Sequence, residues 1–102
     1  MGLDAYLEDE LGEELDLFID DGGILAAAIP SGDASYPMLR HVDIEGVTAF
    51  NRLQLSVVIP ELERLEAANA AMNNTKAAIA KVLKMARKAA AEPHLYLSFL
   101  GD

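Results

Sequence analysis

Few residues of this chain combine a type and a spacing that could support catalysis or metal binding. His41, Asp43 and Glu45 alternate along one short segment, so an extended backbone would place an imidazole and two carboxylates on one side. With Asn51 and Arg52 they could form a small metal-dependent hydrolase site. The same alternation is typical of a solvated strand edge and turn, which is our preferred interpretation. We therefore predict no catalytic residue, metal site or cofactor, and keep Asp43, Glu45, Asn51 and Arg52 as candidate binding residues.

Other potential sites are weaker still. The chain contains no cysteine, which excludes disulfides and thiolate metal ligands. Asp20 and Asp21 precede two glycines, but the ligand spacing and closing glutamate of an EF-hand are missing, so this segment is expected to be a plain turn. His94 follows Pro93 and is expected to begin a strand.

Charge is distributed unevenly. The net charge is −9, and residues 1–21 contain nine acidic residues and no lysine or arginine; these acids are Asp4, Glu8, Asp9, Glu10, Glu13, Glu14, Asp16, Asp20 and Asp21. Five of the eight basic residues fall between positions 76 and 88. We expect the acidic segment to form either a solvated surface or a docking face for a cationic partner, represented by Asp4, Glu8, Asp16 and Asp20.

This charge pattern, without a catalytic constellation, favours a small acidic binding or regulatory protein. An inhibitor or immunity-like partner of a basic protein fits it best. The alternatives are the metal-dependent hydrolase described above and a structural homo-oligomer, because exposed Met and Leu side chains beside the Ala-rich helix permit a dimer seam. The overall potential disfavours nucleic acid. No run reaches the roughly 18 apolar residues of a membrane span, so a cytoplasmic protein is expected.

The acidic segment itself is predicted to form a hairpin. Residues 3–8 and 15–20 each alternate apolar and polar side chains around the tetrapeptide 9–12, which gives one apolar and one acidic face. In the second run, Leu15, Leu17 and Ile19 are the expected apolar face. A helix remains the alternative, since leucines recur every four residues, but Gly12 disfavours it.

The strongest helix signal runs from Phe50 to Met72. Asn51 can cap its start and Gln54 can complete a capping box, with an apolar stripe following at helical spacing; the stripe consists of Leu55, Val58, Ile59, Leu62, Leu65 and Met72. Pro60 interrupts the pattern. We expect a kink or, preferably, a leading turn followed by a main helix that begins at Pro60.

A second helix is predicted over residues 76–91, where alanines and other apolar residues separate from the five bases. Asn73 and Asn74 can adopt the left-handed conformation before it, and Thr75 can cap it. After Pro93, residues 94–100 alternate and predict a final strand that returns to the hairpin. The sequence thus predicts a single domain, residues 1–102, of the α+β class: a small, mainly antiparallel sheet packed against an antiparallel two-helix hairpin.

The central segments are less regular. Ile24 to Ile29 is either a buried strand or a single helical turn, and residues 31–37 are expected to form a loop. Met38 to Val42 is a candidate middle strand, which turns through residues 43–46 into residues 47–50.

Part of the chain resembles a recurrent pattern. Residues 47–54 read Val-Thr-Ala-Phe-Asn-Arg-Leu-Gln, residues 60–65 read Pro-Glu-Leu-Glu-Arg-Leu, and residues 97–102 read Leu-Ser-Phe-Leu-Gly-Asp. These segments resemble small bacterial proteins, of the actinobacterial type, that share a Thr-x-Phe-Asn-x-Leu-Gln motif. Those proteins have a Pro-Tyr-Gly-Asp-like turn where this chain has Ile44-Glu45-Gly46-Val47. The resemblance implies no activity.

Overall fold

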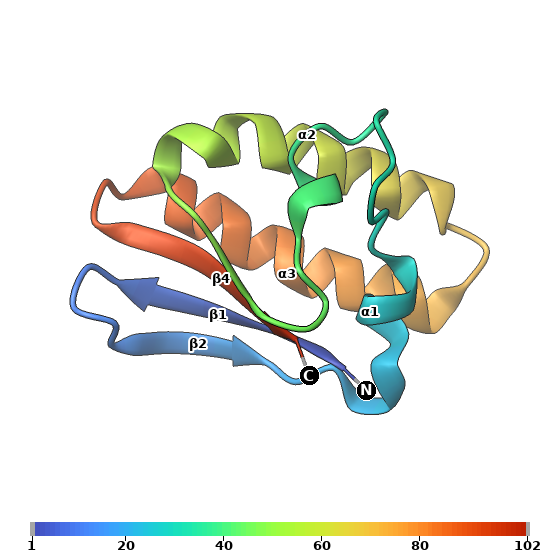
Figure 1. The fold of residues 1–102 in the computed structure, drawn as a ribbon, viewed down its shortest axis with the longest axis horizontal. Coiled ribbons are helices and arrows are strands. Elements are labelled where there is room, and N and C mark those ends of the chain that lie inside the picture. Colours follow the sequence, from blue (N-terminus) through green and yellow to red (C-terminus); the bar gives the residue numbers. More distant parts are fainter. Residues whose placement is uncertain (1, 102) are drawn as a thin grey trace.

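A computed structural model describes residues 2–101 and shows an α+β fold, as predicted (Figure 1). A four-stranded antiparallel sheet, ordered β2-β1-β4-β3, packs against a hairpin of two long helices. Met1 and Asp102 lie outside the described residues. Asp102 is the last residue of the segment 97–102 that was used in the resemblance above. The elements, with η marking 3-10 turns, are β1 (Leu3–Asp9), β2 (Glu14–Phe18), η1 (Asp21–Gly23), α1 (Ile24–Ala28), η2 (Leu39–His41), β3 (Val47–Phe50), α2 (Arg52–Ala68), α3 (Asn73–Ala91) and β4 (Leu95–Gly101).

The N-terminal hairpin forms as predicted, and the helical alternative is wrong. The turn is closed by the Asp9 side chain, which accepts the N–H groups of Leu11 and Glu13, each at 2.9 Å. Gly12 adopts a φ of 79° in this turn, a conformation that costs glycine little. The short polar turn thus supplies its own hydrogen bonds and lets β1 and β2 pair directly.

The face assignment of β2, in contrast, was wrong. A register shift between Leu7 and Glu8 places Glu14 opposite Glu8 but Asp16 opposite Leu7. Because an extra residue on one strand changes which side chains share a face, Asp16 and Phe18 lie on the helix-facing side. Leu15 and Ile19 are instead 47% and 56% exposed. Alternation along the sequence cannot reveal such a bulge.

The C-terminal strand β4 pairs with β1 over seven residues, and β3 pairs with β4 at the edge of the sheet. The strand that comes from the middle of the sequence is therefore β3, residues 47–50. The predicted strand Met38 to Val42 instead contains the 3-10 turn η2. The Glu61 carboxylate accepts the N–H groups of Met38 and Leu39. With these donors directed at a side chain of α2, the segment cannot join a strand ladder.

Helix α2 begins as predicted, with Asn51 and Gln54 forming a reciprocal capping box. The expectation that the main helix starts at Pro60 is wrong, because Pro60 lies inside one helix of 17 residues. Four apolar residues on both sides of the proline are buried: Leu55, Val58, Leu62 and Leu65. Burying each of these contributes roughly 1.5–3 kcal/mol, which together exceeds the cost of about 3 kcal/mol for an interior proline.

Helix α3 starts earlier than predicted, at Asn73, with Met72 as the N-cap residue and Thr75 inside the helix. The left-handed conformation expected at Asn73 and Asn74 does not occur, since no non-glycine residue among positions 2–101 has a positive φ. The Ala-rich side of α3 is buried against α2 and the sheet, and residues 24–28 form the helical turn α1 beside it. The core therefore lies between one face of the sheet and the helices.

Candidate functional site

The candidate residues that follow η2 do not form a catalytic cluster. Asp43 and Glu45 are exposed, and an oxygen of Asp43 accepts the N–H of Glu45 in a local turn. His41 contacts the neighbouring Arg40 through its Nε2 atom at 3.3 Å. Within residues 2–101, no group of three or more His, Asp or Glu side chains could hold a metal ion. The geometry therefore gives no support to the hydrolase hypothesis.

Asn51 has a structural role. Its side-chain oxygen accepts the Gln54 N–H at 2.9 Å, and the Gln54 side chain accepts the Asn51 N–H at 2.9 Å. Arg52, the first residue of α2, is exposed and has no hydrogen bond or ion pair from its side chain within the described residues. The four candidate binding residues thus lie at opposite ends of β3, with Asp43 and Glu45 in the turn before it and Asn51 and Arg52 at the start of α2 after it.

Two carboxylates are buried and bind backbone N–H groups. Asp20 is 6% exposed and accepts the N–H groups of Leu3, Leu25 and Ala26 at 2.8–2.9 Å. Glu61 is 2% exposed and holds η2 in place. Asp20 was expected on the acidic face, and the importance of Glu61 was not anticipated. The only sequence signal for Glu61 is its position on the apolar side of α2.

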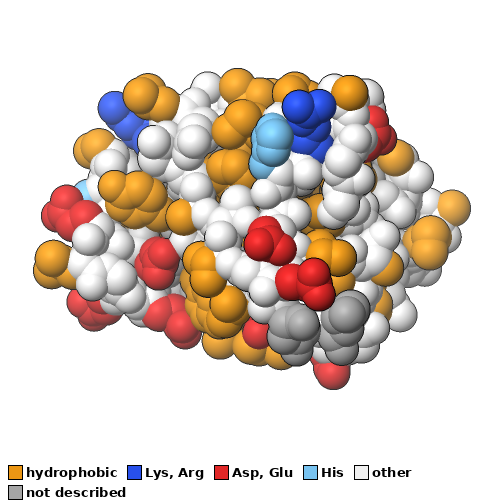
Figure 2. All heavy atoms as spheres, in the orientation of Figure 1, with side chains coloured by type: hydrophobic (Ala, Val, Ile, Leu, Met, Phe, Trp, Pro, Cys, Tyr) orange, Lys and Arg blue, Asp and Glu red, His pale blue; other side chains and the backbone are white. Residues whose placement is uncertain are grey.

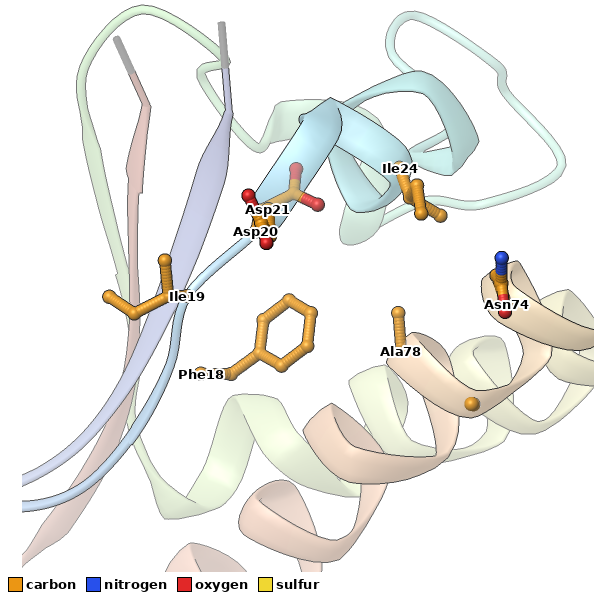
Figure 3. Close-up of a pocket in the computed structure, with 8 residues that line it drawn as sticks. Phe18, Ile19, Asp20, Asp21, Ile24, Asn74 and Ala78 are labelled. Carbon is orange, nitrogen blue, oxygen red and sulfur yellow. The ribbon is translucent and has the colours of Figure 1, made fainter.

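The hollow beside Asp20 has a volume of about 390 Å³ and lies between the end of β2, α1 and the start of α3 (Figure 3). Its walls are mainly apolar, with the Phe18 ring facing Ile24 and Ala78. The Asp20 carboxylate already binds three N–H groups, which leaves Asp21 and Asn74 as the polar groups at its rim. This hollow has no convergent pair of groups that could carry out acid–base chemistry.

The outer face of the sheet, opposite the helices, presents a different surface. Strand pairing defines three rows across it, since directly opposite residues point to the same side. The first row is Leu17, Tyr6, Ser98 and Ala49; the second is Asp4, Leu100 and Val47; the third is Glu14, Glu8 and Tyr96. We use "outer face" for these ten residues. Val47 is 70% exposed and Leu100 is 40% exposed, so the face combines carboxylates with uncovered apolar side chains.

A second hollow, of about 310 Å³, lies on this outer face. Tyr6, Glu8 and Glu14 line its acidic side, and Val47 and Leu100 line its apolar side. Burial and then the charges of Asp4, Glu14 and Glu8 raise the pKa of the Tyr6 phenol. The phenol therefore remains neutral at physiological pH.

Of the four residues predicted to represent an acidic face, only Asp4 and Glu8 lie on the outer face. Asp16 is on the opposite side, where an oxygen accepts a hydrogen bond from Lys81 at 3.0 Å, and Asp20 is buried. Sequence analysis missed Glu14 and Tyr6 as site residues. Both could have been found by alternation, because Tyr6 lies between Asp4 and Glu8 and Glu14 lies two positions before Asp16. The bulge explains instead why Asp16 is not on the outer face with Glu14.

Basic residues are absent from all four strands. The eight lysines and arginines lie in η2, α2 and α3: Arg40, Arg52, Arg64, Lys76, Lys81, Lys84, Arg87 and Lys88. Figure 2 shows the same division, with acidic side chains mainly over the lower half and the visible basic ones at the upper, helical side. The molecule therefore has a negative sheet side and a helical layer that carries every base.

Comparisons of the chain with models of protein families, with curated proteins and with solved structures found no match. Among the described residues, none of the helices combines the length and hydrophobicity that crossing a membrane requires.

Proposed function

We propose that this protein is a non-enzymatic binding or regulatory protein whose outer face binds a basic protein, in the manner of an inhibitor or immunity protein. The observation that carries the proposal is the separation of charge between the two layers. The outer face holds Asp4, Glu8 and Glu14 with no base among its residues. A basic partner would be steered to this face electrostatically. The cysteine-free composition suits the cytoplasmic location that belongs to this proposal.

Uncovered apolar side chains support binding rather than simple solubility. Val47 and Leu100 are direct cross-strand partners on the outer face, and they add exposed apolar surface beside Tyr6 and the carboxylates. Protein interfaces typically combine apolar contact area with polar groups around it. A surface that served only to keep the protein soluble would need charge without this exposed apolar group.

The bases of the helical layer are partly neutralised within the molecule. Lys81 pairs with Asp16 at 3.0 Å, and Arg87 pairs with Glu63 at 2.9 Å. In the part of the chain that the structure describes, the carboxylate of Glu14 has no such ion pair or hydrogen bond. This difference favours the outer face over the basic helix as the binding surface.

The test is affinity capture from a lysate of the source organism. Because the chain has no cysteine, Lys84→Cys on the exposed side of α3 allows attachment at one point with the outer face free. We expect a basic protein to be retained and then eluted by moderate salt. The double variant Glu8→Gln/Glu14→Gln should lose this protein.

The matched control is Glu66→Gln/Glu92→Gln, which changes the net charge equally but lies outside the outer face. It should capture the same protein as the original chain. Capture that resists salt, that is lost equally in both double variants, or that does not occur would contradict the proposal.

A further inference from the structure

Glu8 and Glu14 are direct cross-strand partners on the neighbouring strands β1 and β2. Like charges at directly opposed positions destabilise a sheet. Glu8 gains one hydrogen bond, from the Ser98 hydroxyl to its Oε1 atom, whereas the Glu14 carboxylate accepts none from residues 2–101. Within residues 2–101, no lysine or arginine forms an ion pair with either carboxylate. Two cross-strand glutamates that, among the described residues, have no neutralising base thus lie at the edge of the second hollow.

An aromatic ring stands beside this pair. Tyr6 lies on the same side of β1 as Glu8, two residues away, and its hydroxyl makes no hydrogen bond within the described residues. Val47 and Leu100 complete the hollow on the opposite side. Its volume of about 310 Å³ lies at the lower end of the roughly 300–1,000 Å³ typical of ligand pockets, which suits a single long side chain.

Another tyrosine of this protein has an arginine over its ring. The guanidinium carbon of Arg64 lies 4.5 Å from the centroid of the Tyr36 ring. An Nη atom of Arg64 also donates a hydrogen bond to the Ser35 carbonyl oxygen at 2.6 Å. Tyr36 therefore has a cation over its ring, while within the described residues Tyr6 has none, although three carboxylates surround it.

We infer that the second hollow binds an arginine side chain of the basic partner, with the guanidinium over the Tyr6 ring and hydrogen bonded to Glu8 and Glu14. This inference rests on the proposed function and specifies its contact. A guanidinium is planar and weakly hydrated, stacks on aromatic rings and directs several N–H groups at carboxylates. Its alkyl stem would pack on Val47 and Leu100. A second copy of this chain that docked symmetrically through its own outer face would instead bring more carboxylates to the same place, because none of its bases lies on that face.

The probe is a pair of capped pentapeptides, each with two alanines on either side of one central residue. One peptide has arginine and the other has citrulline, which is similar in shape but uncharged. In amide NMR titrations at low ionic strength, the arginine peptide should cause saturable shifts at residues of the hollow such as Tyr6, Gly12 and Leu100. The citrulline peptide should bind at least about tenfold more weakly, since it lacks the charge-assisted hydrogen bonds.

Three variants separate the contributions of ring and charge. Tyr6→Leu and Glu14→Gln should each weaken binding of the arginine peptide by about tenfold. Tyr6→Phe retains the ring and should bind like the original chain. Glu66→Gln on α2 is the charge control and should leave the affinity unchanged. Thermal melts should show that all four variants fold, because none of them changes a fully buried side chain.

Several results would overturn the inference: no binding of the arginine peptide, equal binding of the citrulline peptide, shifts spread over all acidic segments, or full affinity in Tyr6→Leu. The proposed function would survive any of these if capture of a basic protein still depended on Glu8 and Glu14. If capture fails as well, both the proposed function and the arginine contact are wrong.

Discussion

The two faces of the sheet use acidic residues in opposite ways. On the helix-facing side and at the ends of the core, carboxylates are committed: Asp20 binds three backbone N–H groups, Glu61 binds two, and Asp16 pairs with Lys81. On the outer face, Asp4 accepts the Asp20 N–H at 2.8 Å and Glu8 accepts the Ser98 hydroxyl, but Glu14, the cross-strand partner of Glu8, has no side-chain partner within residues 2–101. The carboxylates on the helix-facing side are therefore all committed, whereas the outer face keeps one that is not.

This difference indicates where function is to be sought. A committed carboxylate is explained by the N–H groups that it binds, so no ligand is needed to account for it. Glu8 accepts the hydroxyl of the buried Ser98, but within the described residues the Glu14 carboxylate beside the Tyr6 ring binds no group that would explain it. Such locally unfavourable arrangements are typical of binding surfaces, where a partner supplies the missing interactions.

The largest expected effect is a loss of stability at one of two leucines of the same strand, Leu97 and Leu100. Leu97 on the helix-facing side of β4 is fully buried, whereas Leu100 on the outer face is 40% exposed. Leu97→Ala should lower the free energy of unfolding by about 2–5 kcal/mol, because it leaves a cavity in the core. Leu100→Ala should lower it by less than about 1 kcal/mol. Urea denaturation measures both, and equal losses would mean that the outer face is also part of the core.

The second comparison sets two acids of the N-terminal segment against each other. Asp20→Asn should destabilise the protein by about 1.5–3 kcal/mol, since an amide group replaces an oxygen that accepts backbone N–H groups. Glu14→Gln should leave stability unchanged or raise it by up to about 1 kcal/mol, because it removes a like-charge pair. Denaturant melts at neutral pH test both. Destabilisation by Glu14→Gln would show that this residue has a structural role.

The elements of the fold were largely predictable, because they depend on local patterns. Helical spacing of apolar residues identified α2 and α3, and alternation identified β1 and β4. The capping box was visible as Asn51 and Gln54 three residues apart. These signals concern neighbours in sequence, so tertiary contacts did not need to be known.

The candidate site was less predictable, because it depends on contacts between distant segments. The bulge opposite Glu8 separates Asp16 from Glu14, so Asp16 lies on the helix side although Glu14, two positions earlier, lies on the outer face. Glu61 determines the path of residues 38 and 39 from a different element, 22 or 23 positions away. No periodicity in the sequence encodes either relation, so both appeared only in the structure.

An intermediate loss of stability is expected at the start of α2. This prediction tests whether Asn51 is a helix cap or a binding residue. Asn51→Ala should reduce stability by about 1 kcal/mol, and Gln54→Ala by less, since Gln54 contributes the second bond of the box. Neither variant should alter binding at the outer face. Chemical denaturation and the peptide titration provide the two measurements. If Asn51→Ala were neutral in stability but lost partner binding, this segment would be a functional site.

The smallest expected effect is at the boundary between the faces, where Asp16 pairs with Lys81. The hydrogen bond from Lys81, and then that from the Leu17 N–H, lower the pKa of the Asp16 carboxyl below its usual value of 3.8. The resulting stability is present above pH 3.8 and is lost as the pH falls through the lowered pKa of the folded state. Both side chains are about 40% exposed, so solvent screening limits the pair to less than about 1 kcal/mol.

Lys81→Met retains most of the side chain's length while removing its charge, so it isolates the ion pair from packing. The stability difference between Lys81→Met and the original chain should be present at pH 6, should decrease in high salt, and should shrink as the pH is lowered below 3.8. Urea melts across this range, with carboxyl NMR of Asp16 in parallel, provide the measurement. A difference that stayed constant with pH and salt would assign the contribution to packing of the lysine stem. The interaction that holds the Asp16 carboxylate would then be the hydrogen bond from the Leu17 N–H rather than the ion pair with Lys81.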